Sequence, residues 1–232
     1  MAWRAVLVYG ASQARMYRTG DAKITEYTAG GGASIPLPHD ALPATADEVG
    51  TRLLAVGRYH VRVGMGRPTA IYDLDTPALT SVDSLVFPKH AAAAASPSAT
   101  EVALAGVTTT GFRVVRMQVP AGSFQEIPVG NLELGTPDEL IATWHANQLW
   151  LLTRTHGDYG VRVIDVDTGA LLGRRDDLGP LFGLVDPVVP LNGFSPKELL
   201  TAVSAPDGTV MAAHQIGPWA GVVLRWSPSC GP

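Results

Sequence analysis

Residues 200–212 read LTAVSAPDGTVMA, in which an Ala-Pro-Asp-Gly turn joins two apolar, strand-like runs. Residues 96–105, with the sequence SPSATEVALA, have the same form, because a proline-containing turn ends in threonine and leads into an apolar run. An arginine follows the threonine of each turn at the same distance, Arg116 in one case and Arg225 in the other. Recurrence at one spacing indicates a repeated structural unit. We therefore expect both stretches to form equivalent hairpin turns in different units.

Five strand-like segments extend this repeat along the chain. Each mixes β-branched and aromatic residues with a charged or polar residue near its end and then a turn former, which is typical of a strand with a solvated tip. Two strands precede most of these segments and a shorter one follows, so each unit of about 40–50 residues holds four antiparallel strands. The segments align on Glu26, Asp73, Arg116, Asp165 and Arg225. The 25 glycines and 18 prolines also favour a fold with many turns.

Four short antiparallel strands per unit, repeated around a ring, make a β-propeller. The Ser-Pro-x-x-Thr turn at 96–100 and the Ile-Asp-Val-Asp-Thr-Gly strand end at 164–169 resemble blades of the WD-repeat-like and YVTN-type propellers. This resemblance implies an all-β fold, a five-bladed β-propeller of four-stranded antiparallel blades, that spans 1–232 as a single domain. A β-sandwich is the alternative. The last unit lacks its fourth strand, because few residues follow Trp226.

An apolar insertion at about 178–194 separates the fourth unit from the fifth. Turns between strands are normally polar, so an apolar segment of this length is typical of a surface that meets a partner. Its candidate binding residues are Phe182, Leu184, Val188 and Val189. The alternative is that the insertion folds back over the edge left open by the missing last strand.

Aromatic and histidine residues beside the expected turns are the other candidate binding residues. A flat apolar ring with a polar edge suits both protein and sugar surfaces. For each of these side chains, packing between blades is the alternative. The candidates are Tyr59, His60, Trp144, His145 and Trp219.

Signatures of catalysis and cofactor binding are weak throughout the chain. Ser12 follows a strand, but it lacks the final glycine and the helix of a nucleophile elbow, and the further glycines of a dinucleotide site are missing. The six histidines show no i,i+3 or i,i+4 ligand pair. We therefore predict a protein that is not an enzyme, with no catalytic residue, no metal ligand and no cofactor.

One enzymatic alternative rests on Asp73, Asp75, Asp165 and Asp167, which lie at corresponding strand ends. A small glycosidase-like propeller would bring such carboxylates together in its central channel, separated by about 5–10 Å. Capping of turns through hydrogen bonds from side chain to backbone is the simpler explanation.

The net charge of −4 argues against a nucleic-acid surface, for which a basic patch is expected. The basic pair Arg174 and Arg175 is followed at once by two aspartates, as in a solvated turn. The single cysteine, Cys230, excludes an internal disulfide. Neither a signal peptide nor a membrane-spanning stretch is visible, so we expect no membrane insertion, and the cellular location stays open.

These features together favour a non-catalytic interaction or structural module. A propeller presents loops on a rigid disc, and loop chemistry can vary without disturbing the core. We expect protein partners in a larger assembly, or a surface glycan. Arginine outnumbers lysine and alanine is abundant, which is typical of a GC-rich genome. A bacteriophage particle, with this chain as a tail-tip or surface protein, is the context we expect.

Overall fold

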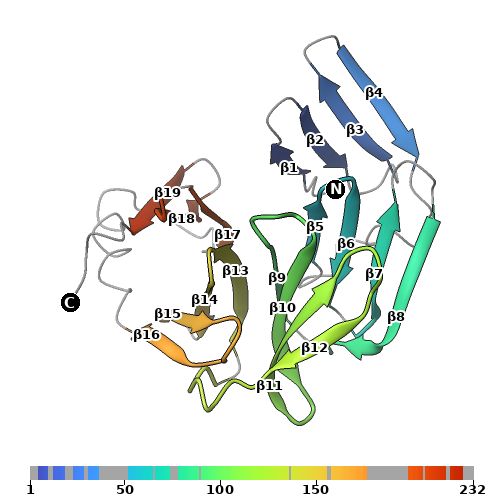
Figure 1. The fold of residues 1–232 in the computed structure, drawn as a ribbon. Coiled ribbons are helices and arrows are strands. Elements are labelled where there is room, and N and C mark those ends of the chain that lie inside the picture. The colour runs from blue at the N-terminus through green and yellow to red at the C-terminus, as the bar shows by residue number, and fades with distance from the viewer. Residues whose placement is uncertain are drawn as a thin grey trace.

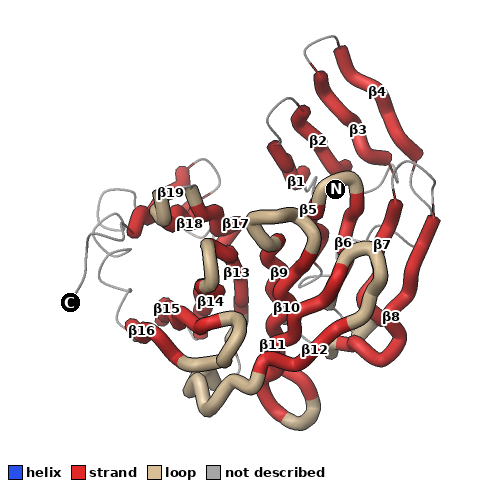
Figure 2. Tube along the Cα trace, viewed as in Figure 1, coloured by secondary structure: helices blue, strands red, loops and turns tan. Residues whose placement is uncertain are grey.

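The chain folds into antiparallel β-strands, as a computed structural model shows for the residues that it describes. These residues are 5–9, 13–18, 23–28, 31–36, 52–64, 66–73, 78–88, 90–135, 137–155, 158–176, 198–205, 207–217 and 220–226. Every regular element among them is a strand (Figure 2). The all-β prediction is therefore confirmed over these ranges.

The strands form five separate sheets, each built from consecutive strands (Figure 1). The first sheet contains β1 (Ala5–Tyr9), β2 (Gln13–Arg18), β3 (Lys23–Thr28) and β4 (Gly31–Pro36), and the second contains β5 (Arg52–Val56), β6 (Tyr59–Val63), β7 (Pro68–Asp73) and β8 (Ala78–Val86). The third contains β9 (Ala91–Ala95), β10 (Glu101–Thr108), β11 (Gly111–Gln118) and β12 (Phe124–Ile127), and the fourth contains β13 (Glu139–His145), β14 (Gln148–Thr155), β15 (Asp158–Asp165) and β16 (Leu171–Arg175). The fifth contains β17 (Glu198–Ser204), β18 (Val210–Gly217) and β19 (Ala220–Trp226), so within the described ranges it has three strands, as predicted.

The second to fifth sheets stack face against face through their first strands. β5 contacts β9, β9 contacts β13, and β13 contacts β17. The first and fifth sheets stand apart, so the described sheets do not close into a ring (Figure 1). A β-sandwich consists of two sheets packed face to face, whereas here five separate sheets follow one another along the chain. The β-sandwich alternative is therefore wrong.

The third sheet shows how sequence alternation builds this stack. On β10, Val102 and Leu104 pack into a core shared with the second sheet, whereas Ala103 and Ala105 pack into a core shared with the fourth. Because both faces are covered, the strand is almost continuously apolar. Its small residues face the fourth sheet, where leucines and Trp144 fill the space between the sheets.

The two turns that predicted the repeat are built alike, from 96–99 between β9 and β10 and from 205–208 between β17 and β18. In the first, the Ala99 N–H donates to the Ser96 carbonyl at 2.9 Å. In the second, the Gly208 N–H donates to the Ala205 carbonyl at 3.0 Å. The fourth residue has a left-handed backbone in both turns, with φ of 53° and 83°. The prediction of equivalent hairpin turns is confirmed for these residues.

The residues after the turns do not match as the sequence spacing suggested. The Ser96 N–H donates to the Glu101 carbonyl, whereas the Ala205 N–H donates to the Thr209 carbonyl. Thr209 therefore takes the place of Glu101 rather than that of Thr100. The fifth sheet thus has one residue fewer after its turn than the third sheet. An irregularity in the pairing of β18 with β19, between Gln215 and Gly217, adds one residue to β18 and restores the spacing to Arg225.

The alignment of the five strand segments was also wrong at three of its anchors, because Thr28, Gln118 and Trp226, and not Glu26, Arg116 and Arg225, pair with the first residue of the preceding strand. Asp73 and Asp165 each pair with the first residue of the preceding strand, Tyr59 and Gln148. In the third sheet that position belongs to Gln118, which pairs with Glu101, and not to Arg116.

Replacing Ala99 with glycine is expected to raise the free energy of unfolding by up to about 1 kcal/mol. A left-handed backbone costs an L-residue roughly 1–2 kcal/mol, part of which is offset by the greater freedom of glycine in the unfolded chain. Urea unfolding measures the change. The exposed turn residue Ala121, which has no positive φ, provides the control. Ala121→Gly is expected to destabilise the chain slightly, and a gain of equal size in both variants would contradict the backbone explanation.

Candidate interaction face

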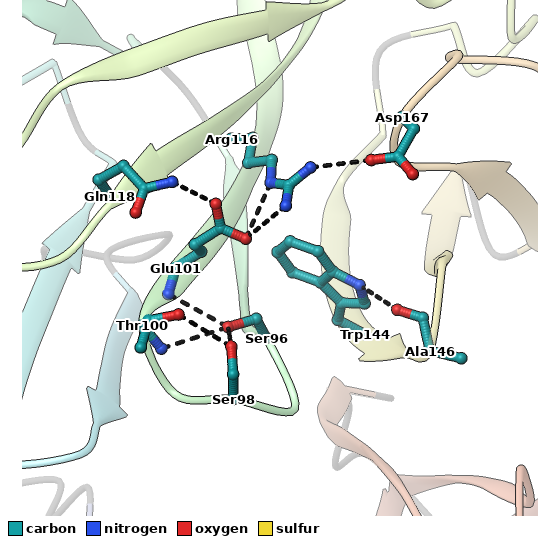
Figure 3. A network of polar contacts seen from close by, with 9 residues as sticks. All are labelled: Ser96, Ser98, Thr100, Glu101, Arg116, Gln118, Trp144, Ala146 and Asp167. Carbon is teal, nitrogen blue, oxygen red and sulfur yellow. Dashed lines mark hydrogen bonds and ion pairs between the residues drawn. The ribbon is translucent and has the colours of Figure 1, made fainter.

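Turns from neighbouring sheets gather at one end of the strands. In an antiparallel four-stranded sheet, the connection between strands one and two and the connection between strands three and four lie at the same end. In the third and fourth sheets these segments are 96–101, 116–123, 144–148 and 165–170, and we call them together the turn face. They bring charged, amide and hydroxyl groups beside one another across the boundary between the two sheets (Figure 3).

An ion pair between Glu101 and Arg116 lies at the centre of the turn face (Figure 3). Both Nε and Nη2 of Arg116 donate to Glu101 Oε2, at 2.9 and 2.7 Å. Gln118 donates its side-chain amide to the other carboxylate oxygen. The hydrogen bond to Glu101 raises the pKa of Arg116, although partial burial opposes the shift. The pair is therefore held in one geometry by the strands β10 and β11.

The same arginine connects the third sheet to the fourth. Arg116 Nη1 donates to Asp167 Oδ1 at 2.8 Å, from a strand to a loop 51 residues further along the chain. Its guanidinium also lies over the ring of Trp144, with 5.6 Å between Cζ and the ring centroid. Trp144 Nε1 donates to the Ala146 carbonyl at 2.8 Å, which orients the indole. Arg116 thus acts as a bridge between neighbouring sheets.

Three hydroxyl groups continue the network over the β9–β10 turn. Ser96 Oγ lies 3.1 Å from Ser98 Oγ, which lies 2.8 Å from Thr100 Oγ1. Ser96 Oγ also accepts the backbone N–H groups of Thr100 and Glu101, at 3.3 and 3.1 Å. These bonds hold the turn in a single shape, and Ser98 and Thr100 stay exposed to solvent.

An open pocket adjoins this network on the third sheet, with a volume of about 340 Å³. The pair Glu101–Arg116 is part of its lining. The ring of Phe124 is half-buried and has the guanidinium of Arg113 over it at 5.4 Å. Neutral polar side chains complete the wall. They are Gln118, Ser123 and Gln125.

The described aspartates among those that suggested a glycosidase have separate partners. Asp73 forms an ion pair with Arg58 at 3.0 Å. Asp165 caps its turn by accepting the backbone N–H groups of Asp167 and Thr168, at 3.0 and 2.8 Å. Asp167 pairs with Arg116, and Asp75 lies outside the described residues. Turn capping is confirmed for Asp165. In the described ranges, no cluster of three acidic, histidine or cysteine side chains could hold a metal ion.

Acid is expected to weaken the fold in part through Asp165. Hydrogen bonds from Thr168, first from its backbone and then from its hydroxyl, lower the pKa of this carboxyl below its usual 3.8. A depressed folded-state pKa adds stability above the unfolded-state value, and that stability is lost as pH falls through the folded-state value. Asp165→Asn should therefore flatten the decline of the urea midpoint between pH 5 and pH 2 relative to the wild type. An identical decline in both proteins would count against this role.

The structure buries two of the four described aromatic and histidine candidates. His60 is 1% exposed and Trp144 is 5% exposed, so the prediction that they lie open at the surface is wrong. Trp144 belongs to the core between the third and fourth sheets, and the packing alternative holds for it. Tyr59 is half-buried, with Arg58 over its ring at 5.0 Å, and His145 is half-buried.

The remaining predicted binding residues lie outside the described residues. They are Phe182, Leu184, Val188, Val189 and Trp219, and with them lies the insertion at 178–194. Ser12 lies outside as well. Conversely, the sequence did not indicate that Glu101 and Gln118 belong to the site, or that Asp167 contacts Arg116. Arg116 stood out as a repeated residue, but its two partners on the fourth sheet could not be read from spacing.

Comparison with known proteins shows which solved structures have a similar fold. No protein-family model and no curated protein matches the chain. Many solved structures resemble it, and three of them illustrate the likeness. TolB from Acinetobacter baumannii is 10% identical with a TM-score of 0.51, and the match covers 98% of this chain and 51% of that one. A putative TolB from Agrobacterium tumefaciens is 11% identical with a TM-score of 0.54, covering 98% and 78%. The computationally designed protein Ika8 is 15% identical with a TM-score of 0.56, covering 95% and 57%.

The chain thus spans about half the length of the first of these structures. The TolB proteins are β-propellers, and the likeness extends over nearly the whole of this chain. At sequence identities this low, structural similarity indicates a shared fold, but it does not indicate a shared ligand or a shared reaction. No helix in the described part of the chain is long and apolar enough to cross a membrane. The five antiparallel sheets therefore have a β-propeller-like fold, as these solved structures do.

Proposed function

We propose that this chain is a non-catalytic β-propeller module that binds a protein partner through its turn face. The observation that supports the proposal is the bridge of Arg116, which fixes loops of two neighbouring sheets in one arrangement. A surface that is already ordered loses little conformational entropy when it binds. We further propose that the five sheets form one five-bladed ring, which would place the turns of every sheet on one disc.

The chemistry of the turn face suits a protein surface. Glu101 and Asp167 both pair with Arg116, and with Asp165 the face carries three carboxylates and one arginine. Amides and hydroxyls are the other polar groups at the surface, with a half-buried aromatic ring beside them. Protein interfaces combine such an aromatic anchor with a polar, hydrated rim. In a bacteriophage particle, the partner would be a neighbouring subunit.

A pair of matched lysine substitutions tests this proposal. Gln125 lines the pocket of the turn face, and Thr109 lies on the β10–β11 turn at the opposite end of the same sheet; both are exposed. Gln125→Lys should reduce recovery of the partner at least tenfold in quantitative co-purification from the native source. Thr109→Lys should leave recovery unchanged. Equal recovery with both variants, or loss with Thr109→Lys alone, would contradict the proposal.

A surface glycan is the second candidate, favoured by the pocket beside Phe124. Sugars are bound by an aromatic ring next to amides and a carboxylate, and here Gln118, Gln125 and Glu101 lie around Phe124. Titration with a panel of neutral monosaccharides and disaccharides, monitored by calorimetry, tests this candidate. Binding that disappears in Phe124→Ala supports it, and heat changes no larger than those of dilution count against it.

A further inference from the structure

The strand β8 forms an open edge of the second sheet (Figure 1). Residues 78–82 pair regularly with β7 on one side, and in the described part of the chain no strand pairs with them on the other. Residues 78–81 are exposed, and Leu79 is 46% exposed. We propose that this edge pairs antiparallel with the same edge of a second copy of the chain, with the two Thr80 residues opposite each other.

The sequence of this edge distinguishes β8 from the outer strands of the third and fourth sheets. Natural proteins protect exposed strand edges with charged residues, prolines or bulges. The outer strand β12 carries Glu126 and is followed by Pro128, and β16 carries Arg174 and Arg175. Residues 78–82, with the sequence ALTSV, contain neither a charged residue nor a proline. This edge therefore lacks the groups that normally prevent a further strand from pairing.

The third sheet supports the edge from one face. A Cβ atom on Gly122 would lie 2.9 Å from Val82 Cγ2 and 3.6 Å from Thr80 Cγ2, so the β11–β12 turn packs closely on β8. Beyond Val82 the pairing with β7 is irregular, since the next pair is Pro68 with Val86. The regular edge thus consists of residues 78–82. Because it is already ordered, little conformational entropy is lost when a strand is added to it.

A second copy is the occupant that this sequence fits. A twofold axis at Thr80 pairs each edge residue with one of the other copy: Thr80 with Thr80, Leu79 with Ser81, and Ala78 with Val82. Every pair is uncharged, and threonine pairs across antiparallel strands are favourable. Closed twofold dimers are also the commonest oligomers of soluble proteins. So short a pairing buries little surface, and we therefore expect a dimer that dissociates on dilution.

The dimer has a consequence for binding. It would carry two turn faces in one particle, and two linked sites bind a partner with repeated binding sites more tightly than one site does. The edge itself does not depend on the turn face or on a closed ring, because its pairing involves only the second sheet.

Charge substitutions at Thr80 test the pairing. In sedimentation equilibrium of the wild type, we expect the mass to rise from 24.4 kDa toward twice that value as the concentration increases. Thr80→Lys and Thr80→Glu each place like charges opposite each other across the twofold axis, so each should weaken dimerisation at least about tenfold. An equimolar mixture of the two variants should regain the dimer, because opposite charges then face each other.

The control substitution is Gln125→Lys, which adds the same charge to the outer strand β12 and should leave the dimer unchanged. A wild-type chain that stays monomeric at all concentrations would overturn the proposal, and so would a dimer that Thr80→Lys leaves intact. If the mixture of charged variants stayed monomeric, the register at Thr80, and with it the proposal, would be wrong.

Hydrogen exchange of the wild type covers the case in which the charged variants fold poorly. Backbone amides in 78–82 should exchange more slowly at high than at low protein concentration, whereas those of the β10–β11 turn should not change. Dimer formation without added protection at 78–82 would contradict the proposal. None of these measurements requires a partner, so failure of the dimer is distinguishable from failure of partner binding.

Discussion

Replacing Arg162 with methionine is expected to lower the free energy of unfolding by about 3 kcal/mol. Arg162 lies on β15 and is 2% exposed, although arginine is rarely buried so completely. Its Nε donates to the Leu132 carbonyl at 2.8 Å, one Nη1 bond reaches the Val161 carbonyl at 2.9 Å, and Nη2 pairs with Asp176 at 2.5 Å. Methionine fills much of the volume but leaves these acceptors without their donor.

The neighbouring Arg174 provides a matched control for this prediction. It shares the partner Asp176 and also pairs with Glu133, but its side chain is 40% exposed. Exposed ion pairs contribute little to stability. Arg174→Met should therefore shift the urea midpoint much less than Arg162→Met does. Equal shifts would show that burial of Arg162 against the segment between β12 and β13 is not what stabilises this region.

Replacing Trp144 with alanine is expected to lower the free energy of unfolding by about 4 kcal/mol. The indole fills the core between the third and fourth sheets, donates to the Ala146 carbonyl and lies beneath Arg116. Alanine would leave a large cavity and remove the face on which the guanidinium rests. Urea unfolding followed by circular dichroism measures the loss.

Two variants separate the contributions of Trp144. Trp144→Phe keeps most of the apolar volume and loses the Nε1 donor, so we expect a loss of about 1–2 kcal/mol. Tyr59→Ala removes a half-buried aromatic side chain from the start of β6 in the second sheet and should cost less than Trp144→Ala. If Trp144→Ala left stability unchanged and abolished partner binding alone, Trp144 would be a binding residue and not a core residue.

Local sequence was sufficient to predict the strands and the turns. Alternation of β-branched residues and the turn formers at segment ends depend on the chain within a few residues, and the predicted third strands fall on β3, β7, β11, β15 and β19. The turn at 205–208 likewise has its shape from its own residues, with glycine at the left-handed position. The register was less predictable. The turn at 205–208 is followed by one residue fewer than the turn at 96–99, and an irregularity in β18 adds one residue back. The spacing from the threonine to the arginine is therefore the same in both units, and the sequence does not reveal the shift.

Burial and the candidate site depended on tertiary structure. A strand sequence shows which residues share a face, but not whether a second sheet covers the opposite face, so His60 and Trp144 were expected at the surface. Arg162 is buried because a segment 30 residues earlier in the chain supplies the Leu132 carbonyl. The bridge from Arg116 to Asp167 joins two sheets that only the stacking of their first strands brings together. The sequence by itself determined the all-β units, since their signals are local; stacking decided which side chains meet, because those contacts lie between units.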